Sequence, residues 1–372
     1  MNNPFSNLFN SLFPTKDTSV LGIDIGSSCI KIIQLKKKGG RAVLETYGEI
    51  STGQYNNTDV GRATVLTADK VSGAIKDLLK ESNATTIKSG MSIPVSSSLI
   101  SFIKMPTLDE RKLVEMVPIE ARKYIPVPIS EVTLDWWPIP KDESTFSEFQ
   151  NGQKVEEEKS TEVLLVVIHN DALSKNKEIQ KITGLDTTFS EIEIFSNIRS
   201  VLEPSTSPQM IVDFGASSTK VFIVERGVLR VSHTISKGSQ DITLSISKSM
   251  GISFEEAEKI KRENGIVGQA GDNNVSEVSF VTIDYILAEI SRMTMSYYKK
   301  TGKKISKIVL AGGGVMLKGF KEKAQEALEI QVEVADPFSK LEYPAFLTEV
   351  LKTAGPEFSV AVGLAIRKLQ EM

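Results

Sequence analysis

Apolar and polar residues alternate between Val20 and Ile50 in a pattern that predicts three β-strands joined by two turns. The second turn contains the charged run KKKGGR at 36–41. Apolar residues then recur at helical spacing at Val71, Ala74 and Leu78, which predicts an amphipathic helix. The chain therefore begins with strands followed by a helix, as expected for an α/β protein.

The same pattern returns in the second half of the chain, after the linker EPSTSPQ at 203–209. The stretch MIVDFGASSTKVFIVERGVLRVSHTI again predicts three strands. Each copy has an aspartate, one further residue, a glycine, small hydroxyl residues and a lysine that enters an apolar strand. The matching residues are Asp24, Gly26, Ser27, Ser28 and Lys31 in the first copy and Asp213, Gly215, Ser217, Ser218, Thr219 and Lys220 in the second. The aspartates lie 189 residues apart (213 − 24), about half the chain, which predicts duplicated domains that face one another.

A third glycine-rich segment follows near the C-terminus. KIVLAGGGVMLKGF predicts a buried strand, a turn formed by Gly312, Gly313 and Gly314, and a helix. Before it, apolar residues from Ile283 to Tyr297 define a strong amphipathic helix. Three glycine-containing turns therefore follow one another in a fixed order.

The N-terminal segment has an apolar pattern of its own. Its apolar residues recur at i, i+3, i+4, i+7 and i+8, which predicts one face of a helix over 1–19: Phe5, Leu8, Phe9, Leu12 and Phe13. The opposite face carries Asn and Ser but no Lys or Arg, which favours docking on protein over docking on a membrane surface. Both alternatives remain open.

Composition excludes several classes of function. The net charge of −3 gives no electrostatic reason to expect nucleic-acid binding. Cys29 is the only cysteine, so an intrachain disulfide and a thiolate metal cage are both excluded, and we expect Cys29 to be a small core residue. The most apolar stretch, VLLVVI at 163–168, is too short to span a membrane, and the N-terminus lacks the pattern of a signal peptide. These features predict a cytoplasmic protein.

The glycine-containing hairpins have a chemical interpretation. Glycine lets the backbone approach a phosphate closely, and serine or threonine hydroxyls add hydrogen-bond donors. An adjacent aspartate can hold Mg²⁺, which prefers oxygen ligands and keeps several waters. One such hairpin alone is more often an ordinary turn, and three glycines alone can simply end a strand. Two matching hairpins followed by the glycine turn predict a nucleotide site that grips a polyphosphate from both sides.

This order of motifs resembles the superfamily of actin, Hsp70 and sugar kinases. LGIDIGSSCIKIIQL resembles its first phosphate loop, MIVDFGASSTKVFIV its second, and IVLAGGGVMLKGF its adenosine motif. IEARKYIPVPISEVTLDWWPI and the N-terminal FSNLFNSLFPTK are most similar to the PilM family of type IV pilus assembly proteins. FtsA, in the same branch, normally carries a C-terminal membrane helix after a linker, whereas this chain ends at AIRKLQEM, which favours PilM over FtsA.

The resemblance implies an α/β, actin-like (ribonuclease H-like) duplicated two-lobed fold with an inserted FtsA/PilM-type subdomain. The expected parts are the amphipathic segment 1–19, a first actin-like subdomain at 20–85 and 184–204, the inserted subdomain at 86–183, and a second lobe at 205–372. Within this fold the resemblance implies ATP and Mg²⁺ as ligands. The implied metal-side residues are Asp24 and Asp213, and the implied nucleotide-side residues are Gly26, Ser27, Ser28, Lys31, Gly215, Ser217, Ser218, Thr219, Gly238, Gly312, Gly313, Gly314 and Leu317.

The resemblance also implies a role. PilM-like proteins are cytoplasmic scaffolds at the inner face of the cytoplasmic membrane that capture the N-terminal cytoplasmic tail of the membrane protein PilN. We therefore expect membrane association through that partner, possible self-association, no nucleic-acid partner, and at most slow ATP hydrolysis. Glu120 is the candidate water-orienting residue, with a solvated position on its helix as the equally weighted alternative. The alternative functions are an FtsA-like filament-forming division protein and a small-molecule kinase of the same superfamily.

Overall fold

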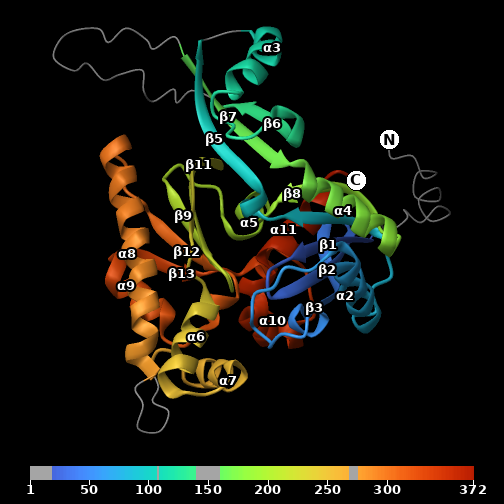
Figure 1. The fold of residues 1–372 in the computed structure, drawn as a ribbon. Helices are drawn as coiled ribbons and strands as arrows, with labels where there is room; N and C mark the ends of the chain where they lie inside the picture. Colours follow the sequence, from blue (N-terminus) through green and yellow to red (C-terminus); the bar gives the residue numbers. More distant parts are fainter. Residues whose placement is uncertain (1–18, 107–108, 140–159, 268–274) are drawn as a thin grey trace, which may run out of the picture. The chain divides into compact units, whose positions relative to one another are not determined.

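The computed structural model describes residues 19–106, 109–139, 160–267 and 275–372 of the chain. The predicted N-terminal helix lies outside the described residues. The chain forms two compact units, Met1–Ser92 with Glu178–Met372, and Ile93–Lys177. The first, larger unit contains two five-stranded sheets, and the second contains a three-stranded sheet (Figure 1).

The first sheet of the larger unit has the strand order β3-β2-β1-β4-β8. Its strands are β1 (Ser19–Ile25), β2 (Cys29–Lys38), β3 (Arg41–Ser51), β4 (Lys88–Ile93) and β8 (Asp186–Ile192). Strands β1, β2 and β3 form an antiparallel meander, and β4 pairs with β1 in parallel. A parallel pairing requires a crossover, which here contains helix α2 (Ala68–Glu81).

The second sheet repeats this topology, with the order β11-β10-β9-β12-β13. Its strands are β9 (Gln209–Phe214), β10 (Thr219–Glu225), β11 (Val228–Ile235), β12 (Lys307–Ala311) and β13 (Gln331–Val334). Again three strands form an antiparallel meander and β12 runs parallel to β9. The predicted duplication and the α/β actin-like class are therefore confirmed.

Helices cover the sheets and bury their apolar stripes. The remaining helices of the larger unit are α5 (Glu193–Val201), α6 (Ser239–Met250), α7 (Phe254–Asn264), α8 (Val275–Thr301), α9 (Phe320–Leu328), α10 (Thr348–Ala354) and α11 (Ser359–Gln370). Single 3₁₀ turns in this unit are η1 (Gly53–Tyr55), η5 (Gly313–Met316), η6 (Pro337–Lys340), η7 (Ala345–Leu347) and η8 (Gly355–Phe358). The predicted stripes of α2 and α8 are buried in the cores of the first and second sheets, respectively.

The last helix returns to the first half of the chain. Helix α11 packs in one core with β1 and β2, so residues near 20–44 and 338–369 share that core. A Cβ atom at Gly22 would lie 2.0 Å from the carbonyl oxygen of Ala361, and one at Gly363 would lie 2.1 Å from that of Ser196. Helix α11 therefore lies against both β1 and α5 at backbone contact, a packing that only glycine permits. The sequence predicted a second lobe of residues 205–372. The closing helix of that range, α11, packs on the first sheet.

The smaller unit has the antiparallel strand order β5-β7-β6. Its strands are β5 (Ser98–Pro106), β6 (Val132–Pro138) and β7 (Ser160–His169), with α3 (Glu110–Ala121), η2 (Val95–Ser97), η3 (Ile129–Glu131) and the start of α4 (Asn170–Thr183). It spans residues 93–177, whereas the sequence predicted 86–183. The difference arises because β4 pairs with β1 and is buried along most of its length, as an interior strand of a sheet must be.

Candidate functional site

The two glycine-containing hairpins have the same backbone geometry. Asp24 pairs with Lys31 across the first hairpin, and Asp213 pairs with Lys220 across the second. The backbone N–H of Gly26 donates to the carbonyl of Cys29 (3.0 Å), three residues on, and that of Gly215 donates to Ser218 in the same way (3.1 Å). The aspartate and lysine of each hairpin are therefore held at corresponding positions.

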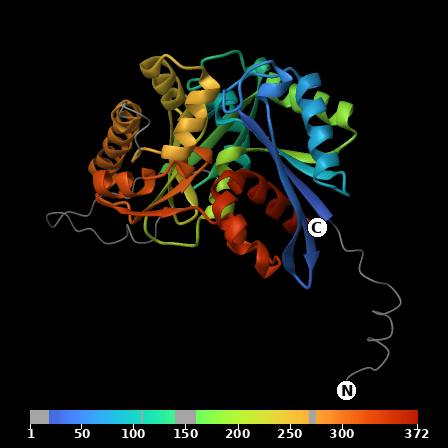
Figure 2. The same cartoon turned by 90° about the horizontal axis from the view of Figure 1, so that it is seen from below.

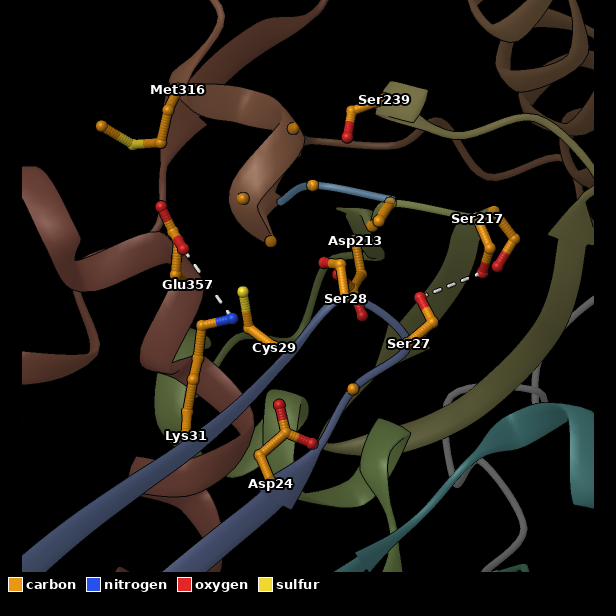
Figure 3. Close-up of a pocket in the computed structure, with 18 of the residues that line it drawn as sticks. Asp24, Ser27, Ser28, Cys29, Lys31, Asp213, Ser217, Ser239, Met316 and Glu357 are labelled. Atoms are coloured by element: carbon orange, nitrogen blue, oxygen red, sulfur yellow. Dashed lines mark hydrogen bonds and ion pairs between the residues drawn. The ribbon is translucent and has the colours of Figure 1, made fainter. Parts of the chain in front are cut away.

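Both hairpins line one cavity of about 370 Å³ within the larger unit. The side chains of Ser27 and Ser217 point toward one another in Figure 3, with their hydroxyl oxygens 3.3 Å apart. A cavity of this volume is of the size that usually holds a small organic ligand. The predicted site residues that line it are Asp24, Gly26, Ser27, Ser28, Lys31, Asp213, Gly215, Ser217, Ser218, Gly312, Gly313, Gly314 and Leu317.

The glycine turn contacts the second hairpin directly. Gly312 has a φ of +85°, and a Cβ atom there would lie 2.4 Å from the Asp213 carboxylate. A side chain at Gly314 would meet the ring of Phe214 at 2.5 Å. Glycine is therefore required at these two positions by backbone conformation and by close packing, in addition to any ligand.

Two of the predicted site residues, Thr219 and Gly238, stabilise the second hairpin without lining the cavity. Thr219 is buried, and its hydroxyl donates to the carbonyl of Lys237 at 2.8 Å. Gly238 approaches Ala216 so closely that a Cβ atom would lie 2.3 Å from its carbonyl oxygen. Neither residue is among those that line the cavity. They hold the second hairpin against the start of α6, where the neighbouring Ser239 lines the cavity instead.

Glu120 lies on α3 of the smaller unit and is not among the lining residues. Its carboxylate accepts hydrogen bonds from Lys123 at 2.8 and 3.0 Å. The first helix after β8 in the larger unit is instead α5, which begins with Glu193, and Glu193 lines the cavity. The role of Glu120 in orienting water stays a prediction.

The structure adds charged residues that the sequence analysis missed. These lining residues are Glu193, Lys220, Glu258, Lys261, Arg262 and Glu357. The sequence could have indicated Lys220 as a site residue, because it is the counterpart of Lys31 in the repeat. The other five lie on α5, α7 and η8. These elements are far from the hairpins along the chain, so the sequence does not show that they line the same cavity. Cys29 also lines the cavity and is partly exposed, so the expectation of a core cysteine is wrong.

Two lysines reach into this acidic environment. The Lys220 ammonium lies 2.7 Å from Glu193 and 3.5 Å from Asp213. Burial alone would lower the pKa of Lys220, but the carboxylates of Glu193, Asp213 and Asp24 raise it overall. Lys31, 3.7 Å from Glu357, also has its pKa raised by neighbouring acidic groups against the effect of burial. Both lysines therefore remain cationic and can neutralise phosphate.

Burial raises the pKa of Asp24, whereas burial alone would lower the pKa of a lysine. Desolvation and the nearby Glu193 carboxylate raise its pKa from 3.8 to about 6, and Lys31 and Lys220 only partly offset that rise. A divalent cation would favour the ionised carboxylate. Among the described residues, no three His, Cys, Asp or Glu side chains form a metal cluster. Asp24 and Asp213 both line the cavity and supply carboxylate oxygens, the kind of ligand that Mg²⁺ prefers.

Comparison with known proteins identifies the chain's relatives. The profile of the family "Type IV pilus assembly protein PilM" matches residues 22–369. The cell division protein FtsA of Staphylococcus epidermidis is 24% identical over 355 residues, which are 85% of this chain and 74% of FtsA. FtsA of Buchnera aphidicola is 29% identical over 181 residues, 41% of this chain and 42% of that protein. The match thus spans less than half the length of the latter relative.

Solved structures share the fold at low sequence identity. The PilM–PilN type IV pilus biogenesis complex gives a TM-score of 0.76 at 22% identity, with 94% of this chain and 98% of that chain covered. EutJ from Carboxydothermus hydrogenoformans gives 0.53 at 14% identity, covering 97% and 96%, and MreB 5 of Spiroplasma citri bound to AMPPNP gives 0.51 at 10%, covering 96% and 98%. With the profile spanning nearly the whole chain, this protein belongs to the PilM family of type IV pilus assembly proteins.

Proposed function

We propose that this protein is an ATP-binding scaffold of a type IV pilus or a related secretion machine. In this role it captures the N-terminal cytoplasmic tail of a PilN-like membrane protein. The observation that carries the nucleotide part is the pair of matched hairpins facing one cavity. The scaffold part is supported by family membership and by the fold shared with a PilM–PilN complex.

The cavity offers suitable groups for each part of Mg²⁺–ATP. The hydroxyls of both hairpins can donate to phosphate oxygens, and Lys31 and Lys220 can neutralise phosphate charge. Asp24 and Asp213 would hold the hydrated Mg²⁺, which supplies charge neutralisation when bound. The glycine turn lets a nucleoside approach the backbone closely.

The site supports at most slow hydrolysis. Glu193 lines the cavity and is the better-placed carboxylate for orienting a water molecule. Its carboxylate is already held by the Lys220 ammonium at 2.7 Å, so it is not free to orient a water molecule unless that ion pair opens. We therefore assign nucleotide binding chiefly to assembly.

The proposed PilN-like partner also implies where in the cell this protein acts. In the described part of the chain, no helix has both the length and the apolarity to cross a bilayer. A scaffold that holds the cytoplasmic tail of a membrane protein would lie in the cytoplasm against the inner face of the membrane. Membrane association would then depend on the partner.

Capture of the tail tests this proposal. A peptide with the sequence of the N-terminal tail of the PilN-like protein encoded in the same genome should retain the full chain in a pull-down, and a scrambled peptide should not. The experiment is run with Mg²⁺–ATP and with EDTA. Failure of the native peptide to retain the chain in either condition would refute the scaffold role.

The FtsA relatives support a second candidate, a nucleotide-dependent filament. The alignment to S. epidermidis FtsA covers 85% of this chain. A filament former should sediment at high speed with Mg²⁺–ATP, whereas a scaffold should remain in small particles. Sedimentation of most of the protein only with nucleotide would favour the filament.

A further inference from the structure

Helix α8 has an apolar stripe on its exposed side. The opposite side is buried against the second sheet, and the helix runs along the outside of that sheet in both views (Figures 1 and 2). Val281 is 74% exposed, Tyr285 49% and Met295 59%. We call the exposed residues Val281, Tyr285, Ala288, Arg292 and Met295 the α8 stripe. Their alternating spacing of four and three residues is the spacing of a helix that packs along another helix.

Charges divide the same helix into two halves. The part before Ala288 contains the acidic residues Glu277 and Asp284, and the part after it contains the basic residues Arg292, Lys299 and Lys300, with the acidic Glu289 next to the centre. Interaction with the helix dipole explains charges only in the first and last turns. Asp284 and Arg292 lie in the middle of α8, and their side chains are 61% and 65% exposed. The dipole therefore does not account for these two residues. Each has a partner within the chain, Lys323 for Asp284 at 3.9 Å and Glu289 for Arg292, but exposed pairs of this kind contribute little and leave both side chains accessible to a second chain.

Three pairs of exposed residues on α8 are placed symmetrically about Ala288. Val281 and Met295 each lie seven residues from Ala288, Asp284 and Arg292 each lie four away, and Glu277 and Lys299 each lie eleven away. At 100° per residue, each of these pairs is centred on the direction of Ala288. An antiparallel copy of α8 crossing at Ala288 would thus place Val281 against Met295 and Asp284 against Arg292. A parallel copy would instead place Asp284 against Asp284, which repels.

We propose that α8 is a self-association surface, on which a second copy of this chain packs α8 antiparallel about a two-fold axis at Ala288. The small Ala288 side chain lets the helices approach at the centre, and the apolar residues on either side exclude water. The charge pairs fix the antiparallel direction and the register. An isologous contact of this kind closes as a dimer. This contact requires neither nucleotide nor the PilN-like tail.

Charge reversal tests the pairing. Asp284→Arg and Arg292→Asp should each weaken self-association about tenfold, because each creates two like-charge contacts in a symmetric dimer. An equimolar mixture of the two variants should associate as well as the parent, because only the mixed dimer restores both attractive contacts. Sedimentation velocity of the full chain over a concentration series measures all three. Lys300→Glu, about 120° around the helix from Ala288, is the matched control and should leave association unchanged.

Cross-linking provides a second readout. In a Cys29→Ser background, Ala288→Cys faces its own copy across the axis and should form an intermolecular disulfide under mild oxidation. Ser296→Cys, also exposed on α8 but on a neighbouring face, should do so at least tenfold more slowly. Three results would each overturn the proposal: a parent chain that stays monomeric, a mixture as weak as the single variants, or equal cross-linking at 288 and 296.

Discussion

At the scale of single residues, the cavity is an arrangement of opposed charges in a low-dielectric environment. Lys31 and Lys220 lower the pKa of Asp24 only in part, and desolvation together with the nearby Glu193 raises it to about 6. The ordinary pKa of an aspartate is 3.8, so the folded chain binds more protons than the unfolded chain between these two values. The contribution of Asp24 to stability therefore falls as pH rises from about 4 to about 6, and the loss persists above pH 6.

Replacing Asp24 should remove this pH dependence. We expect Asp24→Asn, without nucleotide and in EDTA, to raise the free energy of unfolding at pH 7.5 by about 1–3 kcal/mol, a range that allows for partial exposure. At pH 4 the gain should vanish, because the parent carboxyl is then protonated in the fold. Denaturant unfolding at both pH values measures the difference, with the exposed Asp186→Asn as control. A gain of equal size at both pH values would show that burial of charge is not its cause.

At the scale of elements, α11 brings the C-terminal end of the chain onto the first sheet. It packs on β1 and α5 through glycines, and it starts with Ser359 and Val360 at the cavity. Arg367 near its end donates to Glu191 at 2.7 Å, as Arg199 of α5 also does. The helix is thus held near its C-terminal end by a partly buried ion cluster, and its N-terminal end lies at the cavity.

The helix crossing gives an opposed pair of predictions for glycine. Gly363→Ala should destabilise the protein by about 1–3 kcal/mol, because its Cβ would overlap the backbone of Ser196 in α5. Gly73→Ala on α2 has no atom within 4 Å of the new methyl and should stabilise the protein by about 0.5–1 kcal/mol. Thermal and denaturant unfolding give both values. Equal effects at the two positions would contradict the close crossing.

At the scale of the whole molecule, the site exists only because segments far apart in the chain converge. The hairpins after Asp24 and Asp213 and the turn at Gly312 come from both sheets of the larger unit. A ligand that contacts all three stabilises the folded chain and shields the cavity wall. Cys29, the only cysteine, lies in that wall and reports its occupancy.

Mg²⁺–ATP should therefore protect Cys29 from alkylation and raise the midpoint of thermal unfolding. At a hundredfold excess over its dissociation constant the ligand should add about 2.7 kcal/mol to the free energy of unfolding. Ser296→Cys in a Cys29→Ser background is the control, because its labelling should not depend on nucleotide. An unchanged Cys29 labelling rate at saturating Mg²⁺–ATP, with no thermal shift, would refute nucleotide binding in this cavity.

The sequence by itself determined the repeat and most of the residues along the cavity. Strand periodicity and the Asp–Gly–Ser pattern are local, and similar local patterns fold into similar hairpins, so Asp24 and Asp213 can be matched from their neighbours in the chain alone. The glycine turn can also be predicted from the sequence, because a positive φ and the close approach of neighbouring atoms both require glycine at Gly312.

Only the tertiary structure decided which distant elements complete the site. Glu193, Lys261 and Glu357 belong to helices and turns whose local patterns are ordinary, and their position depends on how α5, α7 and η8 pack. The same reason explains the boundary of the smaller unit and the return of α11 to the first sheet, because β4 and α11 pack against partners that lie far away in the chain. Local propensity specifies an element, but burial against non-local neighbours specifies where that element lies.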